Sequence, residues 1–127
     1  MARITIGIIG LGRMGMAIAH RLINNNHSVV GYDPNPQSCL ELEAQGAQAV
    51  PNIADVAKLA RIFWIMVPQG KPVDDVIAHL MPNLKAGDII IDGGNSFFKD
   101  STRRYNELAS KQIAFFRLWH LWRPRWT

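Results

Sequence analysis

The chain has 127 residues, 48% of them hydrophobic, which suits one domain with a packed core and excludes a disordered chain. Its apolar runs have the length of strands and Met1 leads directly into one, so we expect neither a membrane span nor a signal peptide. A single cysteine, Cys39, excludes an internal disulfide and is typical of a cytoplasmic protein.

Most of the net charge of +4 comes from the C-terminal end. The last eleven residues contain Arg117, Arg123 and Arg125 and no acid, whereas residues 1–116 contain eleven basic and ten acidic residues. Three of the four tryptophans lie in the same end. A basic, aromatic tail can bind single-stranded nucleic acid, but the nearly neutral body gives no sign of that partner or of a membrane. We therefore separate a domain over 1–116 from a tail of aberrant composition over 117–127.

The first half of the domain alternates strand and helix. Apolar, β-branched residues at 4–9 predict a buried strand, and apolar residues four apart predict a helix over 13–25. Three asparagines then mark a turn before a short strand at 28–32. Pro36 is typical of the first position of a helix, and Gly46 marks the end of that helix.

The middle of the chain continues this alternation. Residues 47–50 predict a short strand, and a helix with an asparagine at its N-cap is expected over 53–60. A buried strand is predicted over 61–67. A helix over 73–80 follows, bounded by prolines on both sides.

The last predicted elements are a strand at 88–92, a helix and a final strand. Two glycines end the strand, and Asp100 or Ser101 is expected to cap a helix that runs to about residue 111. Residues 113–116 begin the final strand. Alternating elements and strands that are apolar on both faces predict an α/β fold. We expect a Rossmann-like doubly wound parallel sheet with helices on both faces, incomplete at its C-terminal end.

The loop between the first strand and the first helix fits the pattern G-x-G-x-x-G. It consists of Gly10, Leu11, Gly12, Arg13, Met14 and Gly15. In a dinucleotide site, Gly10 permits the tight turn, Gly12 lets a pyrophosphate approach the backbone, and Gly15 lets the helix pack on the strand. The helix N-terminus supplies N–H groups for the pyrophosphate. The alternative is a set of glycines that serves only a tight turn.

Asp33 ends the second predicted strand, 23 residues after Gly10. A carboxylate at this position accepts hydrogen bonds from the ribose hydroxyls of NAD and repels the 2′-phosphate of NADP. The chain has no arginine or lysine between Arg21 and Lys58 to bind that phosphate. NAD is therefore expected as the cofactor in preference to NADP. The alternative is that Asp33 forms a turn before Pro34.

Two further strand ends have distinctive sequences, Val67-Pro68-Gln69-Gly70 and Asp92-Gly93-Gly94-Asn95-Ser96. With the glycine loop, they resemble in order and spacing the N-terminal domain of 6-phosphogluconate dehydrogenase, through about residue 116. Residues 32–36 resemble the shorter, NAD-preferring branch of that family. The resemblance implies oxidative decarboxylation of 6-phosphogluconate to ribulose 5-phosphate and carbon dioxide, with hydride passed to NAD, in the pentose phosphate pathway.

The resemblance also implies roles for individual residues. Val67, Pro68 and Gln69 line the cofactor near its nicotinamide half. Asn95 contacts the nicotinamide ribose and the substrate, with a simple turn residue as the alternative. Ser96 either contacts the substrate or caps the following helix. The four histidines show no metal-ligand spacing, and no catalytic residue is assigned within this chain.

The catalytic lysine and glutamate of the family come from a later helical domain, and a Gly-Thr-Ser-Gly-Gly substrate loop follows the strand that corresponds to 113–116. Neither is in this sequence. We therefore expect an inactive fragment that self-associates through an open sheet edge. One alternative is a β-hydroxyacid dehydrogenase of the 3-hydroxyisobutyrate type. Members of that family look like Asp-x-Ser-Thr at the strand end where this chain has Asp92–Ser96, which argues against this alternative. The other is a non-catalytic dinucleotide-binding module.

The missing loop suggests an origin for the tail. Tryptophan has the single codon TGG, so Trp119 before His120 encodes glycine when read one nucleotide later, and Trp122 before Arg123 does the same. With permitted codons elsewhere, 117–126 then reads Asp-Cys-Gly-Thr-Ser-Gly-Gly-Leu-Ala-Gly. Our hypothesis is a frameshift, which the encoding DNA can test. The alternative is a genuine extension that binds a partner.

Overall fold

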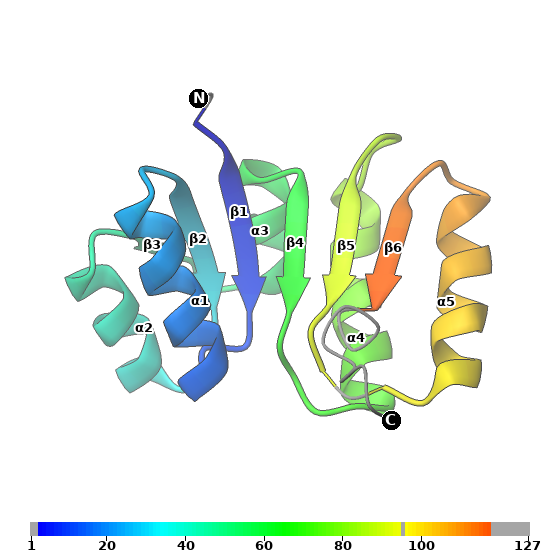
Figure 1. The fold of residues 1–127 in the computed structure, drawn as a ribbon, viewed down its shortest axis with the longest axis horizontal. Coiled ribbons are helices and arrows are strands. Elements are labelled where there is room, and N and C mark those ends of the chain that lie inside the picture. Colours follow the sequence, from blue (N-terminus) through cyan, green and yellow to red (C-terminus); the bar gives the residue numbers. More distant parts are fainter. Residues whose placement is uncertain (1–2, 95, 118–127) are drawn as a thin grey trace, which may run out of the picture.

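The computed structural model describes residues 3–94 and 96–117. Within them, six parallel strands form one sheet in the order β3-β2-β1-β4-β5-β6 (Figure 1). The strands are β1 (Thr5–Ile9), β2 (Ser28–Tyr32), β3 (Gln48–Ala49), β4 (Ile62–Ile65), β5 (Ile89–Asp92) and β6 (Ala114–Arg117). The predicted Rossmann-like fold is confirmed.

Five α-helices and one short 3₁₀-helix connect these strands. They are α1 (Arg13–Asn24), α2 (Pro36–Ala44), α3 (Ile53–Leu59), α4 (Lys71–Leu80), the 3₁₀-helix η1 (Met81–Asn83) and α5 (Phe98–Ala109). Among the described residues, none of these helices is both long and apolar enough to cross a bilayer.

Two apolar clusters cover the two faces of the sheet. One joins Met16 and Ala19 of α1 with Leu42 of α2, and the other contains buried residues of α3, α4 and α5. Figure 1 shows α1 and α2 in front of the sheet and α3 and α4 behind it. Neighbours in β1 divide between the clusters, Ile8 in one and Ile9 in the other, because successive side chains point to opposite faces. This explains why the strands are apolar throughout.

Each predicted strand and helix is present, but several boundaries were wrong. The strand predicted over 61–67 is β4, which covers only 62–65. It stops there because its neighbour β1 ends at Ile9, whose carbonyl accepts the last hydrogen bond between the two segments from the Met66 N–H at 2.7 Å. The helix predicted from residue 73 begins at Lys71, so that Pro72 lies within its first turn.

The predicted cap of the last helix was also wrong. Phe97 is the N-cap of α5, and its carbonyl accepts from the Ser101 N–H at 3.1 Å. Asp100 lies in the first turn, where a carboxylate favours the helix dipole, and Ser101 is buried within the helix.

Strand β6 lies at the edge of the sheet, as predicted for the last strand. It includes Arg117, the first residue of the predicted tail, which pairs in register with Asp92 of β5. Residues 118–127, on which the frameshift hypothesis mainly depends, lie outside the described residues.

Candidate dinucleotide site

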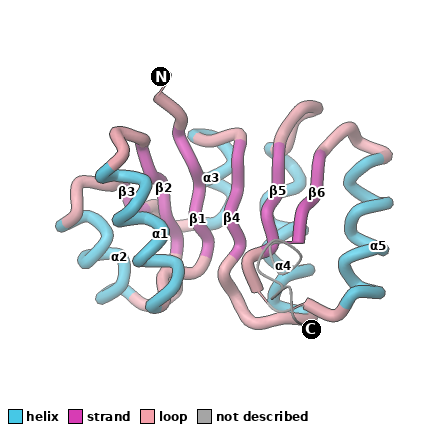
Figure 2. The backbone as a smooth tube through the Cα atoms, viewed as in Figure 1, coloured by secondary structure: helices cyan, strands magenta, loops and turns pink. Residues whose placement is uncertain are grey.

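The loops that carry the predicted site residues lie at one edge of the sheet. Parallel pairing places Ile9 beside both Tyr32 and Ile65, and Ile65 beside Asp92, so strands β1, β2, β4 and β5 end together. Figure 2 shows the loops after β1, β4 and β5 along the lower edge of the molecule. This carboxyl edge is where open α/β sheets bind ligands.

Gly10 and Gly15 shape the turn from β1 into α1. Gly10 has a φ of +101°, and a Cβ there would lie 2.7 Å from the Met66 carbonyl oxygen. A Cβ at Gly15 would collide with the Gly10 carbonyl oxygen. The turn is closed by the Gly10 N–H, which donates to the Tyr32 carbonyl at 2.9 Å. A side chain at Gly15 would push α1 off the end of β1, and a side chain at Gly10 would collide with the backbone that follows β4.

Gly12 differs from these two glycines because it faces open space. It is the N-cap of α1 and is exposed, and no described atom lies within 4 Å of where its Cβ would be. The side chains of Arg13 and Met14 in the first turn are also exposed. The first-turn N–H groups of a helix have no partner within the helix, so this open end can accept an anion such as a pyrophosphate.

Asp33 ties the glycine loop to the end of β2. Its Oδ2 accepts from the Leu11 N–H at 2.7 Å, and its Oδ1 accepts from the Asn35 N–H at 2.8 Å. Because each carboxylate oxygen has two acceptor sites, Asp33 can still accept from ribose hydroxyls. The Leu11 side chain is buried in the core, so Leu11 contributes only its backbone to the loop.

The loops after β4 and β5 approach each other at the same edge. Val67 packs partly against the core, whereas Pro68 and Gln69 are exposed. A Cβ at Gly94 would lie 3.1 Å from the Val67 carbonyl oxygen, which shows how close the two loops are. A Cβ at Gly93 would lie 2.6 Å from the Trp64 indole nitrogen. The two glycines therefore allow the loops to pack together.

A buried carboxylate holds the loop after β5. Asp92 is fully buried, and its Oδ1 accepts from the Gly94 N–H at 3.0 Å. Its Oδ2 accepts from the hydroxyl of Ser96, which is also buried. In this structure the Ser96 hydroxyl therefore holds the loop. Asn95, predicted to contact the nicotinamide ribose and the substrate, lies outside the described residues.

Sequence reasoning missed Arg104, whose side chain is only 1% exposed. Its Nε donates to Asp74 Oδ1 at 2.8 Å, and one terminal nitrogen donates to the Gly70 carbonyl at 3.1 Å. Ser101, Arg104 and Leu108 lie three and four positions apart, which places an arginine on the inner face of α5. The sequence therefore contained one indication of this residue, an arginine among the buried positions of a helix.

The hydrogen bonds between Asp74 and the two arginines of α5 shift the pKa values at this place. The hydrogen bond from Arg104 lowers the pKa of Asp74 below its usual value, with further lowering from Arg103, while partial burial opposes the shift. In return, Asp74 raises the pKa of Arg103. The aspartate therefore stays ionised to lower pH than a free carboxyl group.

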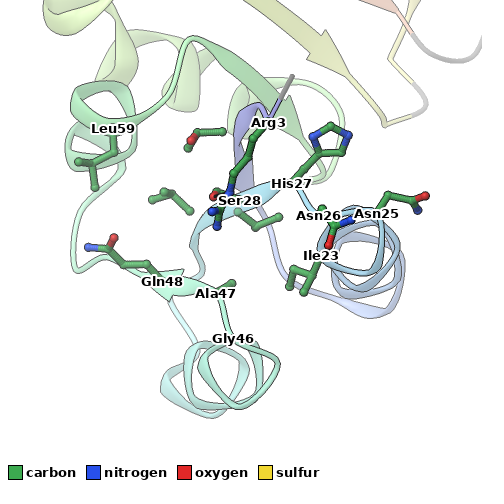
Figure 3. Close-up of a pocket in the computed structure, with 13 residues that line it drawn as sticks. Arg3, Ile23, Asn25, Asn26, His27, Ser28, Gly46, Ala47, Gln48 and Leu59 are labelled. Atoms are coloured by element: carbon green, nitrogen blue, oxygen red, sulfur yellow. Dashed lines mark hydrogen bonds between the residues drawn. The ribbon is translucent and has the colours of Figure 1, made fainter. Parts of the chain in front are cut away.

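Two pockets among the described residues do not involve the loops after β4 and β5. One, of about 820 Å³, begins at Gly12 and Arg13 and is lined by residues of α1 and α2. The other, of about 940 Å³, lies at the opposite edge of the sheet, around Arg3, His27 and Ser28 (Figure 3). None of the predicted site residues that the structure describes lines that second pocket. Over residues 3–94 and 96–117, no group of three or more His, Cys, Asp or Glu side chains could hold a metal ion.

Comparison with known proteins identifies a family. The chain is 42% identical over 123 residues to the decarboxylating 6-phosphogluconate dehydrogenase of Candida albicans, covering 91% of this chain and 24% of that protein. It is 41% identical over 118 residues to the NAD(+)-dependent, decarboxylating 6-phosphogluconate dehydrogenase of Bacillus subtilis strain 168, covering 87% and 25%. The chain thus spans about a quarter of the length of these two relatives.

A solved structure shows the same fold. The 3-hydroxyisobutyrate dehydrogenase of Salmonella typhimurium superposes with a TM-score of 0.80 at 28% identity, covering 88% of this chain and 40% of that one. Residues 5–118 match the model of the NAD binding domain of 6-phosphogluconate dehydrogenase. The chain therefore belongs to the family of NAD-binding domains of 6-phosphogluconate dehydrogenase.

Proposed function

We propose that this chain is the cofactor-binding part of an NAD-dependent 6-phosphogluconate dehydrogenase. The observation that carries the proposal is the open N-terminus of α1 at Gly12, adjacent to a carboxylate that is fixed by backbone hydrogen bonds. An open helix end binds phosphate, and a fixed carboxylate binds hydroxyl groups. The two features together fit the adenosine diphosphate half of a dinucleotide.

The residues divide between the two halves of the cofactor. N–H groups at the start of α1, around Gly12 and Arg13, bind the pyrophosphate, while Asp33 accepts from the adenosine ribose. The loops after β4 and β5, which lie against each other at this edge, are proposed to enclose the nicotinamide half. Asn95 and Ser96, in the second of these loops, are proposed to contact the substrate.

The reaction assigned to the whole enzyme is the oxidation and decarboxylation of 6-phosphogluconate to ribulose 5-phosphate and carbon dioxide. NAD, when bound, accepts the hydride. The residues of this chain bind and orient the cofactor, and the proton-transferring lysine and glutamate belong to a later helical domain of the family. We therefore propose that the 127-residue chain alone binds NAD without turning over substrate, in the cytoplasm and as a homo-oligomer.

Dehydrogenation of a 3-hydroxyisobutyrate-type substrate is the second candidate. The structural similarity to the Salmonella typhimurium enzyme favours it. The sequence relatives favour 6-phosphogluconate, since both of those described above are named as decarboxylating 6-phosphogluconate dehydrogenases.

Calorimetric titration of the chain with NAD⁺ and NADP⁺ tests the proposal. NAD⁺ should bind more tightly because Asp33 repels a 2′-phosphate. The double substitution Asp33→Ser with Pro34→Arg should narrow or reverse that preference, since arginine can bind the phosphate. Thermal melting of the variant checks that the lost Leu11 and Asn35 bonds have not unfolded it. Tighter NADP⁺ binding by the unmodified chain, or binding of neither cofactor, would contradict the proposal.

A further inference from the structure

A buried guanidinium connects the two loops proposed to enclose the nicotinamide half. Arg104 reaches from α5 to the carbonyl of Gly70, which ends the loop after β4, and to Asp74 in the first turn of α4. Its remaining nitrogen lies 3.9 Å from Oδ2 of Asp92 at the end of β5. One side chain thus lies against the end of the loop after β4 and the start of the loop after β5.

Asp92 transmits this contact to the loop after β5. The same carboxylate accepts from the Gly94 N–H and from the Ser96 hydroxyl, so its position sets the position of both residues. Ser96 donates to the oxygen that faces Arg104. A shift of about 1 Å would bring the Arg104 nitrogen within hydrogen-bond distance of that oxygen. Arg104 and Ser96 therefore face the same carboxylate oxygen, which has acceptor sites for both.

The terminal nitrogen that faces Asp92 has no hydrogen-bond acceptor among the described residues. Burying a charged group with an unused donor is unfavourable, and an apolar side chain at this position would avoid that desolvation. Packing alone therefore does not account for an arginine at this position. Its contacts with Asp74 and Gly70 at the start of α4 and with Asp92 at the end of β5 do account for it.

We infer that Arg104 is a positioning residue that fixes the two loops around the nicotinamide half of the cofactor. The inference rests on the proposed function, because it needs a dinucleotide at this edge of the sheet. Arg104 acts through Gly70 and Asp92 and need not touch the cofactor itself. Binding of the adenosine diphosphate half, at Gly12 and Asp33, should not depend on it.

Two ligands and one neighbouring residue make a selective test. NAD⁺ spans both halves of the site, whereas ADP lacks the nicotinamide nucleoside. Arg103 is the matched control, because it also bonds Asp74, at 3.0 and 3.2 Å, but is exposed and pairs otherwise with Asp100 and Glu107 of its own helix. Dissociation constants for both ligands are measured by calorimetry on the full chain, after melting curves have established that each variant is folded.

The expected pattern differs between variants. Arg104→Gln should raise the Kd for NAD⁺ about tenfold and change the Kd for ADP less than about twofold, because only the nicotinamide half loses its fixed loops. Arg104→Lys keeps the charge but not the forked geometry, so its NAD⁺ affinity should be intermediate. Ser96→Ala should also weaken the binding of NAD⁺ more than the binding of ADP. Arg103→Gln should leave both constants within about twofold, as expected for an exposed ion pair.

If Arg104→Gln weakened the binding of NAD⁺ and of ADP equally, the inference would be overturned, because equal weakening would indicate a general loss of structure. Unchanged NAD⁺ binding in that variant would overturn it as well, while leaving the proposed function intact. Failure of the unmodified chain to bind NAD⁺ would instead contradict the proposed function. If Arg104→Gln does not fold, Arg104→Lys decides, and unchanged NAD⁺ affinity in that variant would end the inference.

Discussion

A Gly12→Ala substitution would add a methyl group in the open space at the N-terminus of α1, where no described atom lies within 4 Å. The φ of Gly12, −69°, is one that alanine adopts without strain. Alanine reduces the entropy of the unfolded chain, which stabilises by about 0.4–1 kcal/mol, but is a poorer N-cap by a similar amount. The free energy of unfolding should therefore change by less than about 1 kcal/mol.

The effect on binding should be much larger. The methyl group would occupy the position where the proposed pyrophosphate meets the backbone N–H groups. Loss of one hydrogen bond to a charged ligand costs about 1.5–3 kcal/mol, so the Kd for NAD⁺ should rise about 10- to 100-fold. Calorimetric titration measures this increase directly.

Gly10→Ala is the matched control for folding. Its φ of +101° and the Met66 carbonyl oxygen, 2.7 Å from the new Cβ, leave no strain-free position for a methyl group. We expect a loss of about 2–3 kcal/mol in the free energy of unfolding, measured by urea denaturation. If Gly12→Ala remains folded and binds NAD⁺ as the unmodified chain does, then the pyrophosphate does not lie on this loop. A loss of stability in Gly12→Ala as large as in Gly10→Ala would show that the space is not open.

Two further predictions follow from the helix contacts and from the sheet edge. Because the hydrogen bond from Arg104 lowers the pKa of Asp74 below 3.8, ionised Asp74 stabilises the fold above that pH, and this stabilisation is lost as the pH falls toward the lowered value. Urea midpoints should therefore fall more steeply between about pH 5 and about pH 3 for the unmodified chain than for Asp74→Asn, and parallel curves would refute this. Strand β6 lies at the sheet edge with the Phe116 side chain 53% exposed, so Phe116→Lys should reduce self-association in sedimentation experiments. A monomeric unmodified chain at high concentration would contradict that prediction.

Local patterns in the sequence were sufficient for the order of elements and for the glycine loop. Continuous apolar runs separated by helical periodicity indicate a parallel sheet because both faces of such a sheet are covered. The spacing from Gly10 to Gly15, followed by an acid at Asp33, predicts a strand, a tight turn and a helix, because the geometry of such a turn depends mainly on residues adjacent in the sequence. The family resemblance rested on the glycine loop and on the strand ends at 67–70 and 92–96, and the match over residues 5–118 confirms it.

Boundaries were less predictable because they depend on the neighbouring element. Met66 and Val67 continue the apolar pattern of β4, yet the strand ends at Ile65 because β1, its partner, ends at Ile9. Asp100 and Ser101 are both good capping residues, but α5 begins before them, at Phe98.

The sequence by itself therefore determined the fold class, the glycine turn between β1 and α1 and the family, since each depends on patterns within short segments of the chain. Only the tertiary structure decided how the loops are held. Arg104 bonds Asp74, 30 positions away, and Gly70, 34 positions away. It also lies beside Asp92, which binds Ser96. No periodic pattern pairs charges at such separations, because their proximity arises from the packing of α5 and α4 beside β5.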